Sequence, residues 1–341
     1  MAEYISFQPS DYYKTNTYTG TGSELAITDV GFQSDSTLIK ESDGGNAWNW
    51  FDSVRGATKY LKTSGDNAEA TDAETLKSWE STGYTVGTSV AENDTGQLYA
   101  GYNWKMGTTS GLTGGTITPS GYSINTTARQ SVIAYTGTGS AATIPHGLGV
   151  APDMIIVKEL SHTTNWAVFH TDAGADYFYI LNETNAKAAT TNWDEGAPTS
   201  TLFNVGGGDQ SNTSGRTYVA YCFANTTGYS SIGSYTGNGN ANGPFINCGF
   251  RPSFVMTKYS DSTGSWCQYN DKVLGYNPDN NQFLLNDNGA AGTGDNIDLL
   301  SNGFKIRVST AESNDDGGSI IYAAFAEFPF VSSNDIPTVA R

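Results

Sequence analysis

The sequence contains three copies of one pattern, and this internal repeat constrains the fold more than any local feature does. Each copy carries a tyrosine, a glycine, a lysine and a tryptophan in the same order. The glycine precedes the lysine by nine residues, and the lysine precedes the tryptophan by eight residues, in every copy. We therefore expect three equivalent units. Their skeletons are Tyr18, Gly31, Lys40 and Trp48; Tyr135, Gly149, Lys158 and Trp166; and Tyr235, Gly249, Lys258 and Trp266.

Each copy also ends on a similar segment, in which two aromatic residues lie three positions apart with small residues between them. The opening and closing segments are separated by roughly 85 residues, the size of a domain rather than of a short solenoid repeat. We expect the first and last strands of each unit to pair. The predicted organisation is an N-terminal arm (1–17), repeat 1 (18–104), a linker (105–130), repeat 2 (131–224), repeat 3 with a short lead-in (225–330) and a C-terminal tail (331–341).

Composition and local pattern predict short strands joined by tight turns. Of the 341 residues 40 are glycine, and aromatic residues reach 12% while charged residues reach only 15%. Apolar runs at 154–157 and 254–256 are typical of strands buried on both faces, whereas 303–308 alternates with a period of two. The expected fold class is all-β, with three tandem antiparallel β-sandwich domains that are jelly-roll-like.

Charge and the terminal sequences narrow the classes of partner. The net charge is −17, from 17 basic and 34 acidic residues, and such a field repels nucleic acid. No apolar run reaches the length of a membrane span, so no membrane insertion is expected. The N-terminus lacks the basic and apolar regions of a signal peptide, and the three cysteines form no disulfide framework. These features predict synthesis in a cytoplasm, whereas the composition, rich in glycine, threonine, asparagine and tyrosine, resembles that of extracellular surfaces. A protein made inside the cell and used outside it without a secretion signal fits a virion component released by lysis.

The repeated tryptophans and lysines are weak candidates for a binding site. Exposed tryptophan rings would stack on sugars, but a tryptophan at one register in every copy is more typical of a core. The lysines would bind a carboxylate or an anionic glycan. The favoured interpretation is that each lysine either ends a strand in solvent or covers the tryptophan with its stem. The candidates are Trp48, Trp166, Trp266, Lys40, Lys158 and Lys258.

No spacing of residues predicts catalysis or a metal site. The three histidines, His146, His162 and His170, follow no metal-binding or nucleophile motif. His170 occupies a position that holds Asp52 and Asn270 in the other repeats, which is typical of a polar surface position. Turns rich in aspartate at 93–96 and 314–317 lack the EF-hand pattern and are typical of hairpins. We expect no enzyme activity, no cofactor and no metal.

Several motifs resemble those of a known family. They are Tyr-Thr-Gly-Thr-Gly at 135–139, the segment from His146 to Lys158 that begins His-Gly-Leu-Gly, the Asn-Trp pair that ends at Trp166, and Tyr-Val-Ala-Tyr at 218–221. Together they resemble a tandem β-module of virion structural proteins from tailed phages of marine bacteria, cyanobacterial phages included. The resemblance extends over about residues 16–331. It implies a virion component of the tail-fibre or adhesin type and implies no catalytic residues.

The expected function is therefore that of a non-enzymatic bacteriophage virion structural protein. A short tail fibre or receptor-binding protein for host adhesion is preferred; the alternatives are a capsid decoration or cement protein and, in another class, a free carbohydrate-binding module protein. The expected partners are other virion proteins of the tail or capsid, and a host cell-surface glycan or protein. We expect a homotrimer, unless three copies in one chain already match a threefold site. Candidate assembly residues in the terminal segments are Tyr4, Ile5, Phe7, Ile336 and Val339.

Overall fold

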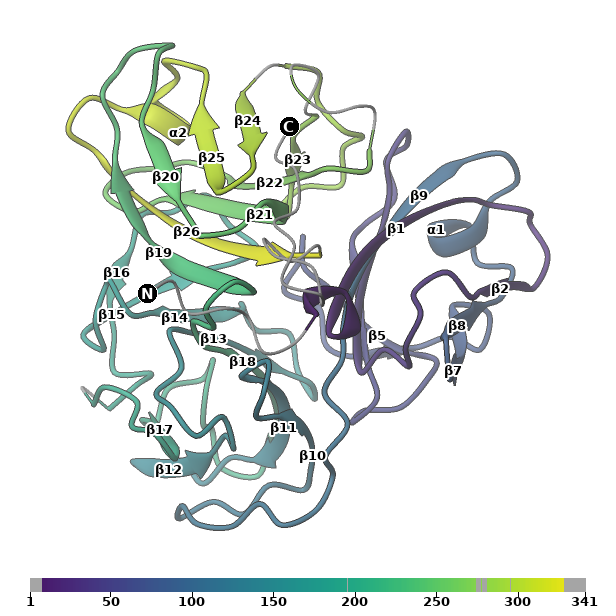
Figure 1. Ribbon diagram of the computed structural model, residues 1–341. Helices are drawn as coiled ribbons and strands as arrows, with labels where there is room; N and C mark the ends of the chain where they lie inside the picture. Colours follow the sequence, from purple (N-terminus) through teal and green to yellow (C-terminus); the bar gives the residue numbers. More distant parts are fainter. Residues whose placement is uncertain (1–7, 195, 274–276, 278–280, 295, 328–341) are drawn as a thin grey trace.

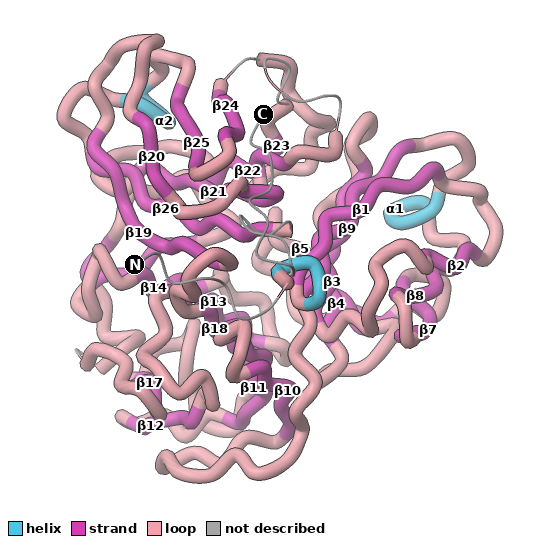
Figure 2. The backbone as a smooth tube through the Cα atoms, viewed as in Figure 1, coloured by secondary structure: helices cyan, strands magenta, loops and turns pink. Residues whose placement is uncertain are grey.

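The computed structural model describes residues 8–194, 196–273, 277, 281–294 and 296–327. Within them nearly all regular structure is β-strand, and the helices are single turns (Figure 2). The predicted all-β class is confirmed, and every strand pair is antiparallel. Among the described residues, no helix has the length and apolar character needed to cross a membrane. The candidate assembly residues and the C-terminal tail lie outside the described residues.

Each repeat contains one large sheet with the same strand order. The first strand pairs with the last, the last with the lysine strand, and the lysine strand with the tryptophan strand, so the expected pairing of first and last strands is confirmed. Repeat 1 has the order β1 (Tyr13–Thr19), β9 (Leu98–Trp104), β3 (Ser36–Glu41), β4 (Asn49–Asp52), β5 (Lys59–Lys62) and β6 (Ala70–Thr71). Repeat 2 has β10 (Gly121–Asn125), β11 (Gln130–Thr136), β18 (Thr217–Phe223), β13 (Met154–Glu159), β14 (Ala167–His170), β15 (Tyr177–Ile180) and β16 (Ala188–Ala189). Repeat 3 has β19 (Ser230–Thr236), β26 (Ser319–Ala326), β21 (Pro252–Tyr259), β22 (Trp266–Asn270) and β23 (Phe283–Leu284).

A small sheet covers the outer face of each large sheet, and the two layers enclose a separate apolar core. Single turns of helix, α1 (Val90–Asn93) and α2 (Ala311–Asn314), precede the last strand in repeats 1 and 3. The small sheets are β2 (Leu25–Ile27), β8 (Gly83–Val86) and β7 (Leu76–Glu80); β12 (Ala142–Pro145) and β17 (Leu202–Val205); and β20 (Phe245–Asn247), β25 (Gly303–Ile306) and β24 (Ile297–Leu300).

The inner faces of the three large sheets meet in one shared core. Along the lysine strand Ile39 faces the core of repeat 1, whereas its neighbour Leu38 faces the shared core, as expected for a strand with alternating sides. Equivalent residues of the three last strands meet at its centre, where the ring centroids of Trp104, Phe223 and Phe325 lie 5.3 to 5.9 Å apart. Figure 1 shows the repeats as three lobes around this centre, so the chain is a pseudo-trimer.

Two predicted boundaries differ from the structure. The N-terminal arm is shorter than residues 1–17, because β1 begins at Tyr13 and the side chain of Tyr13 is fully buried in the shared core. The predicted linker at 105–130 contains β10, which extends the large sheet of repeat 2 by pairing with β11. Since the three repeats share a core, we describe them as repeats rather than as separate domains.

Candidate functional site

Three boundaries join the repeats (1/2, 2/3 and 3/1), and equivalent contacts recur at each of them. The first of these contacts is made by the repeated tryptophan. Each indole N–H donates to a backbone carbonyl of another repeat, at 2.8 to 3.0 Å. The accepting residues are equivalent, since each pairs with the residue that follows its own repeat's tryptophan. The contacts run in one direction around the ring and close it. They join Trp166 to Lys62, Trp266 to Ile180 and Trp48 to Leu284.

A backbone hydrogen bond provides the second contact of each boundary. An N–H from the loop after β5, β15 or β23 donates to the carbonyl two residues beyond the lysine of the next repeat, at 2.9 to 3.0 Å. The donors and acceptors are Glu69 and Leu160 at the 1/2 boundary, Lys187 and Ser260 at the 2/3 boundary, and Ala291 and Ser42 at the 3/1 boundary.

The polar position shared by Asp52, His170 and Asn270 supplies a third contact, and the expectation that it lies on the surface is wrong. All three side chains are buried, because the tryptophan strand ends against the last strand of another repeat. Tyr221 donates its hydroxyl to Asp52 at 2.8 Å, whereas His170 Nε2 lies 3.3 Å from the carbonyl of Tyr322. In the third case Asn270 donates to the hydroxyl of Tyr102 at 3.0 Å.

The tryptophan candidates are core residues. Trp48 and Trp166 have no exposed surface and Trp266 is 1% exposed. Their rings pack against other aromatic rings, as when Trp166 stacks on Trp50 of repeat 1 with centroids 5.7 Å apart. A sugar therefore has no access to these rings.

The lysine candidates are also buried, so the expectation that they end strands in solvent is wrong. The reason is that both faces of the lysine strand are covered, one by a small sheet and one by the shared core. Each ammonium group donates to the carbonyl of the next residue, at 2.6 to 3.0 Å, and burial lowers the pKa of all three to about 8. The groups concerned are those of Lys40, Lys158 and Lys258.

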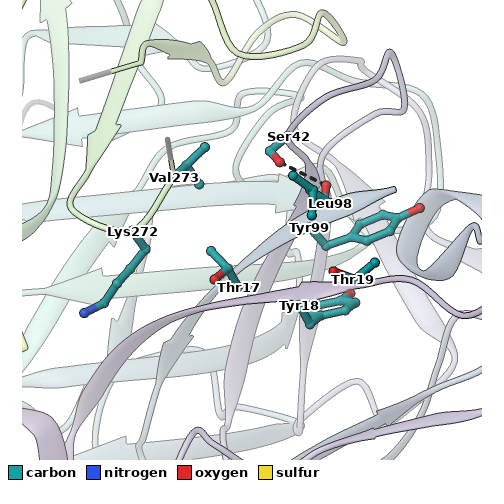
Figure 3. A pocket seen from close by; sticks show the side chains of 8 residues that line it. All are labelled: Thr17, Tyr18, Thr19, Ser42, Leu98, Tyr99, Lys272 and Val273. Carbon is teal, nitrogen blue, oxygen red and sulfur yellow. Dashed lines mark hydrogen bonds between the residues drawn. The ribbon is translucent and has the colours of Figure 1, made fainter. Parts of the chain in front are cut away.

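Two clefts open at equivalent places in the ring, where the first and last strands of one repeat face the loop after the tryptophan strand of another. The cleft at the 3/1 boundary has a volume of about 190 Å³. Figure 3 shows Lys272 and Val273 of repeat 3 on one side of this cleft and its repeat 1 residues on the other. Its lining residues are Thr17, Tyr18, Thr19, Ser42, Leu98 and Tyr99 of repeat 1, and Lys272 and Val273 of repeat 3.

The cleft at the 1/2 boundary, which we call the 1/2 cleft, is about 380 Å³ in volume and carries more charge. Arg55 is almost fully buried at its base, where it pairs with Asp52 and with Glu69. Lys59 lies 3.2 Å from the other oxygen of Glu69 and is 43% exposed. The remaining lining residues are Val54, Ser120, Ala134, Tyr135, Leu160, Ser161, Thr217 and Tyr218. Sequence analysis did not identify these residues, because Arg55, Lys59 and Glu69 have no counterparts of the same charge at the equivalent positions of the other repeats.

The turns that precede the last strands have a structural role, because each contains a buried asparagine that holds another turn of its repeat. In each repeat its side-chain oxygen accepts the backbone N–H of the threonine or asparagine that opens the first turn, at 2.7 to 2.8 Å. Among the described residues no group of three or more histidine, cysteine, aspartate or glutamate side chains is placed to hold a metal ion. The asparagines are Asn93, Asn212 and Asn314.

The histidines make separate contacts. His146 accepts the backbone N–H of Leu148 at its Nδ1, and burial lowers its pKa to about 4. His162 lies on the surface, 2.8 Å from Glu159. Burial likewise lowers the pKa of His170 to about 4.

Repeat 1 contains a fully buried glutamate that sequence analysis did not identify. Glu92, in α1, has no exposed surface, and Asn49 donates its amide to Oε1 of the carboxyl group. Neither Oε2 of Glu92 nor Oδ1 of Asn49 has a hydrogen-bond partner. Burial raises the pKa of Glu92 to about 7, and hydrogen bonds from Ser89 and Asn49 offset only part of this effect. Two buried oxygens without a hydrogen-bond partner suit a protonated carboxyl group, which carries a donor that a carboxylate lacks.

A family model described as a domain of unknown function (DUF7483) matches residues 8–329. The match spans all three repeats as one unit, in keeping with their shared core. A search among curated proteins finds no match.

Proposed function

The chain belongs to this family of domains of unknown function, and we propose that it is a non-enzymatic structural protein of a tailed-phage virion that contributes to host adhesion. The resemblance of its repeat motifs to virion modules supports the proposal. So does the strongly acidic character, which disfavours nucleic acid as a partner. Rigid sheets that present turns and clefts suit adhesion, since binding residues are commonly held in loops by a rigid scaffold.

The observation that carries the proposal is the closed ring. Trp48 of repeat 1 reaches repeat 3, so each boundary contact finds its partner within the chain. A closed ring offers a pseudo-threefold body, which suits a threefold position on a virion. It also favours the alternative to a homotrimer, because the contacts that would join three chains are already used within one. We therefore propose that one chain occupies each such position.

The place of the protein on the particle separates the preferred role from its alternative. A short tail fibre or receptor-binding protein would lie on the tail, and a decoration or cement protein would lie on the capsid. A pseudo-threefold body suits either place. A free carbohydrate-binding protein would be absent from purified particles.

Immunogold labelling of intact virions tests the proposal directly. We expect antibodies against the protein to label purified particles of the phage that encodes it, at the tail for a fibre. Labelling on the head would support the decoration role. Particles without label, together with absence of the protein from their peptide mass spectra, would overturn the virion proposal.

A further inference from the structure

One pair of equivalent side-chain positions distinguishes the 1/2 boundary from the 2/3 boundary. At the 2/3 boundary these positions hold Lys187 and Asp261, whose charged groups lie 3.1 Å apart and bridge the two repeats. At the 1/2 boundary the same positions hold Glu69 and Ser161, which cannot form an ion pair. Glu69 pairs instead with residues of its own repeat, so the 1/2 cleft is not bridged at this point.

The pair at the 1/2 cleft presents a hydrogen-bond donor beside an acceptor. The ammonium group of Lys59 is the donor, and the carboxylate of Glu69, whose side chain is 15% exposed, is the acceptor. Each carboxylate oxygen accepts two hydrogen bonds, so Glu69 keeps capacity beyond its contacts with Lys59 and Arg55. Two adjacent hydroxyl groups of a sugar match this arrangement, because one donates to the carboxylate while its neighbour accepts from the ammonium group.

The rest of the lining suits a sugar that carries no net charge. Hydroxyl groups of Ser120, Ser161 and Thr217 line the cleft together with the apolar side chains of Val54 and Leu160. Small-molecule sites typically combine an apolar lining with a few placed polar groups.

The balance of charges at the 1/2 cleft also favours a neutral sugar. Two cationic groups at the cleft, Arg55 and Lys59, are balanced by the carboxylates of Asp52 and Glu69. The remainder of the chain is acidic, and its net charge of −17 disfavours the approach of an acidic glycan.

We propose that the 1/2 cleft binds a neutral pyranose sugar through Lys59 and Glu69. This inference deepens the proposed function, on which it rests for the source of the sugar, a neutral polysaccharide of the host surface. The cleft at the 3/1 boundary has half the volume of the 1/2 cleft, and among the described residues no lysine–glutamate pair equivalent to Lys59 and Glu69 lines it. We therefore assign the sugar site to the 1/2 cleft.

Saturation-transfer NMR with D-glucose, D-galactose and D-mannose tests the site, with sialic acid as the charged comparison. We expect at least one neutral sugar to bind and sialic acid not to bind. Both Lys59→Gln and Glu69→Gln should weaken binding by at least about tenfold, the effect of losing one charged hydrogen bond. Because the side chain of Lys59 is 43% exposed, its variant should fold normally, and a thermal melt verifies this.

Two further variants sharpen the test. Glu69→Lys combined with Ser161→Asp should transfer the Lys187–Asp261 bridge to the 1/2 cleft and abolish binding. Glu74→Gln is the matched control, since Glu74 lies in the same repeat, is 47% exposed and pairs with Lys77 outside the cleft. It should leave binding unchanged.

The outcomes separate this inference from the proposed function. If no neutral sugar binds, or if the cleft variants bind as well as the control, the inference is overturned. The proposed function would still stand if the protein labels virions and competes with them for adsorption to host cells. Sugar binding that the cleft variants abolish supports the inference, even if virions carry no label and the proposed function fails.

Discussion

Truncation of Trp166 to alanine is expected to lower the free energy of unfolding by about 3–5 kcal/mol, the cost of removing a large buried aromatic side chain. Its ring is fully buried and stacks on Trp50 across the 1/2 boundary. The substitution also removes the N–H that binds the carbonyl of Lys62. Urea denaturation followed by fluorescence and circular dichroism would measure the loss.

Two comparisons identify the cause of that loss. Trp166→Phe keeps most of the ring and deletes the hydrogen bond, so it should cost about 1–2 kcal/mol. Trp79→Ala removes a half-buried tryptophan from the small sheet of repeat 1, away from any boundary, and should cost less than Trp166→Ala. If Trp166→Ala were as mild as Trp79→Ala, the boundary contacts would not have the role assigned to them.

A rise in pH is expected to destabilise the protein through Glu92. Its pKa is about 7 in the folded chain, against an ordinary value of 4.5, so the folded state binds the proton more tightly than the unfolded state. The stability from this group is therefore complete below pH 4.5 and is lost as the pH rises to about 7. The shift corresponds to about 3 kcal/mol.

The test compares Glu92→Gln with the unmodified chain across this range of pH. A glutamine supplies permanently the donor that a protonated Glu92 would supply, so the variant should gain relative stability as the pH rises. The difference between the proteins is the useful quantity, because His146 and His170 have lowered pKa values and give the opposite slope in both. A difference that does not change with pH would show that Glu92 is not protonated in the fold.

The repeat spacing predicted the strand pairing because the register of a sheet fixes equivalent positions. If the closing segments are aligned on their two aromatic residues, Tyr322 of repeat 3 matches Tyr99 and Tyr218. The register places Ile320 there instead, since Ile320 pairs with the opening Tyr235 as Tyr99 pairs with Tyr18. A shift of two residues keeps a side chain on the same face of a strand, so the sequence pattern looks the same in both alignments.

The shared core and the clefts could not be predicted from the sequence, because both depend on how one repeat packs against another. Continuous apolar runs indicated lysine strands buried on both faces, but not that another repeat covers the second face. Lys158, at the end of such a run, was therefore expected in solvent. The residues of the 1/2 cleft, Lys59 and Glu69, lie in a part of repeat 1 where the repeats differ, so repetition could not identify them.

Differential scanning calorimetry of the whole chain tests most directly whether the three repeats form one body around a shared core. A closed ring should unfold in a single transition, with a calorimetric enthalpy equal to the van't Hoff enthalpy, even though the chain has 341 residues. Repeats that fold independently would instead give two or three separable transitions, each with a fraction of the total enthalpy. That result would contradict the closed ring.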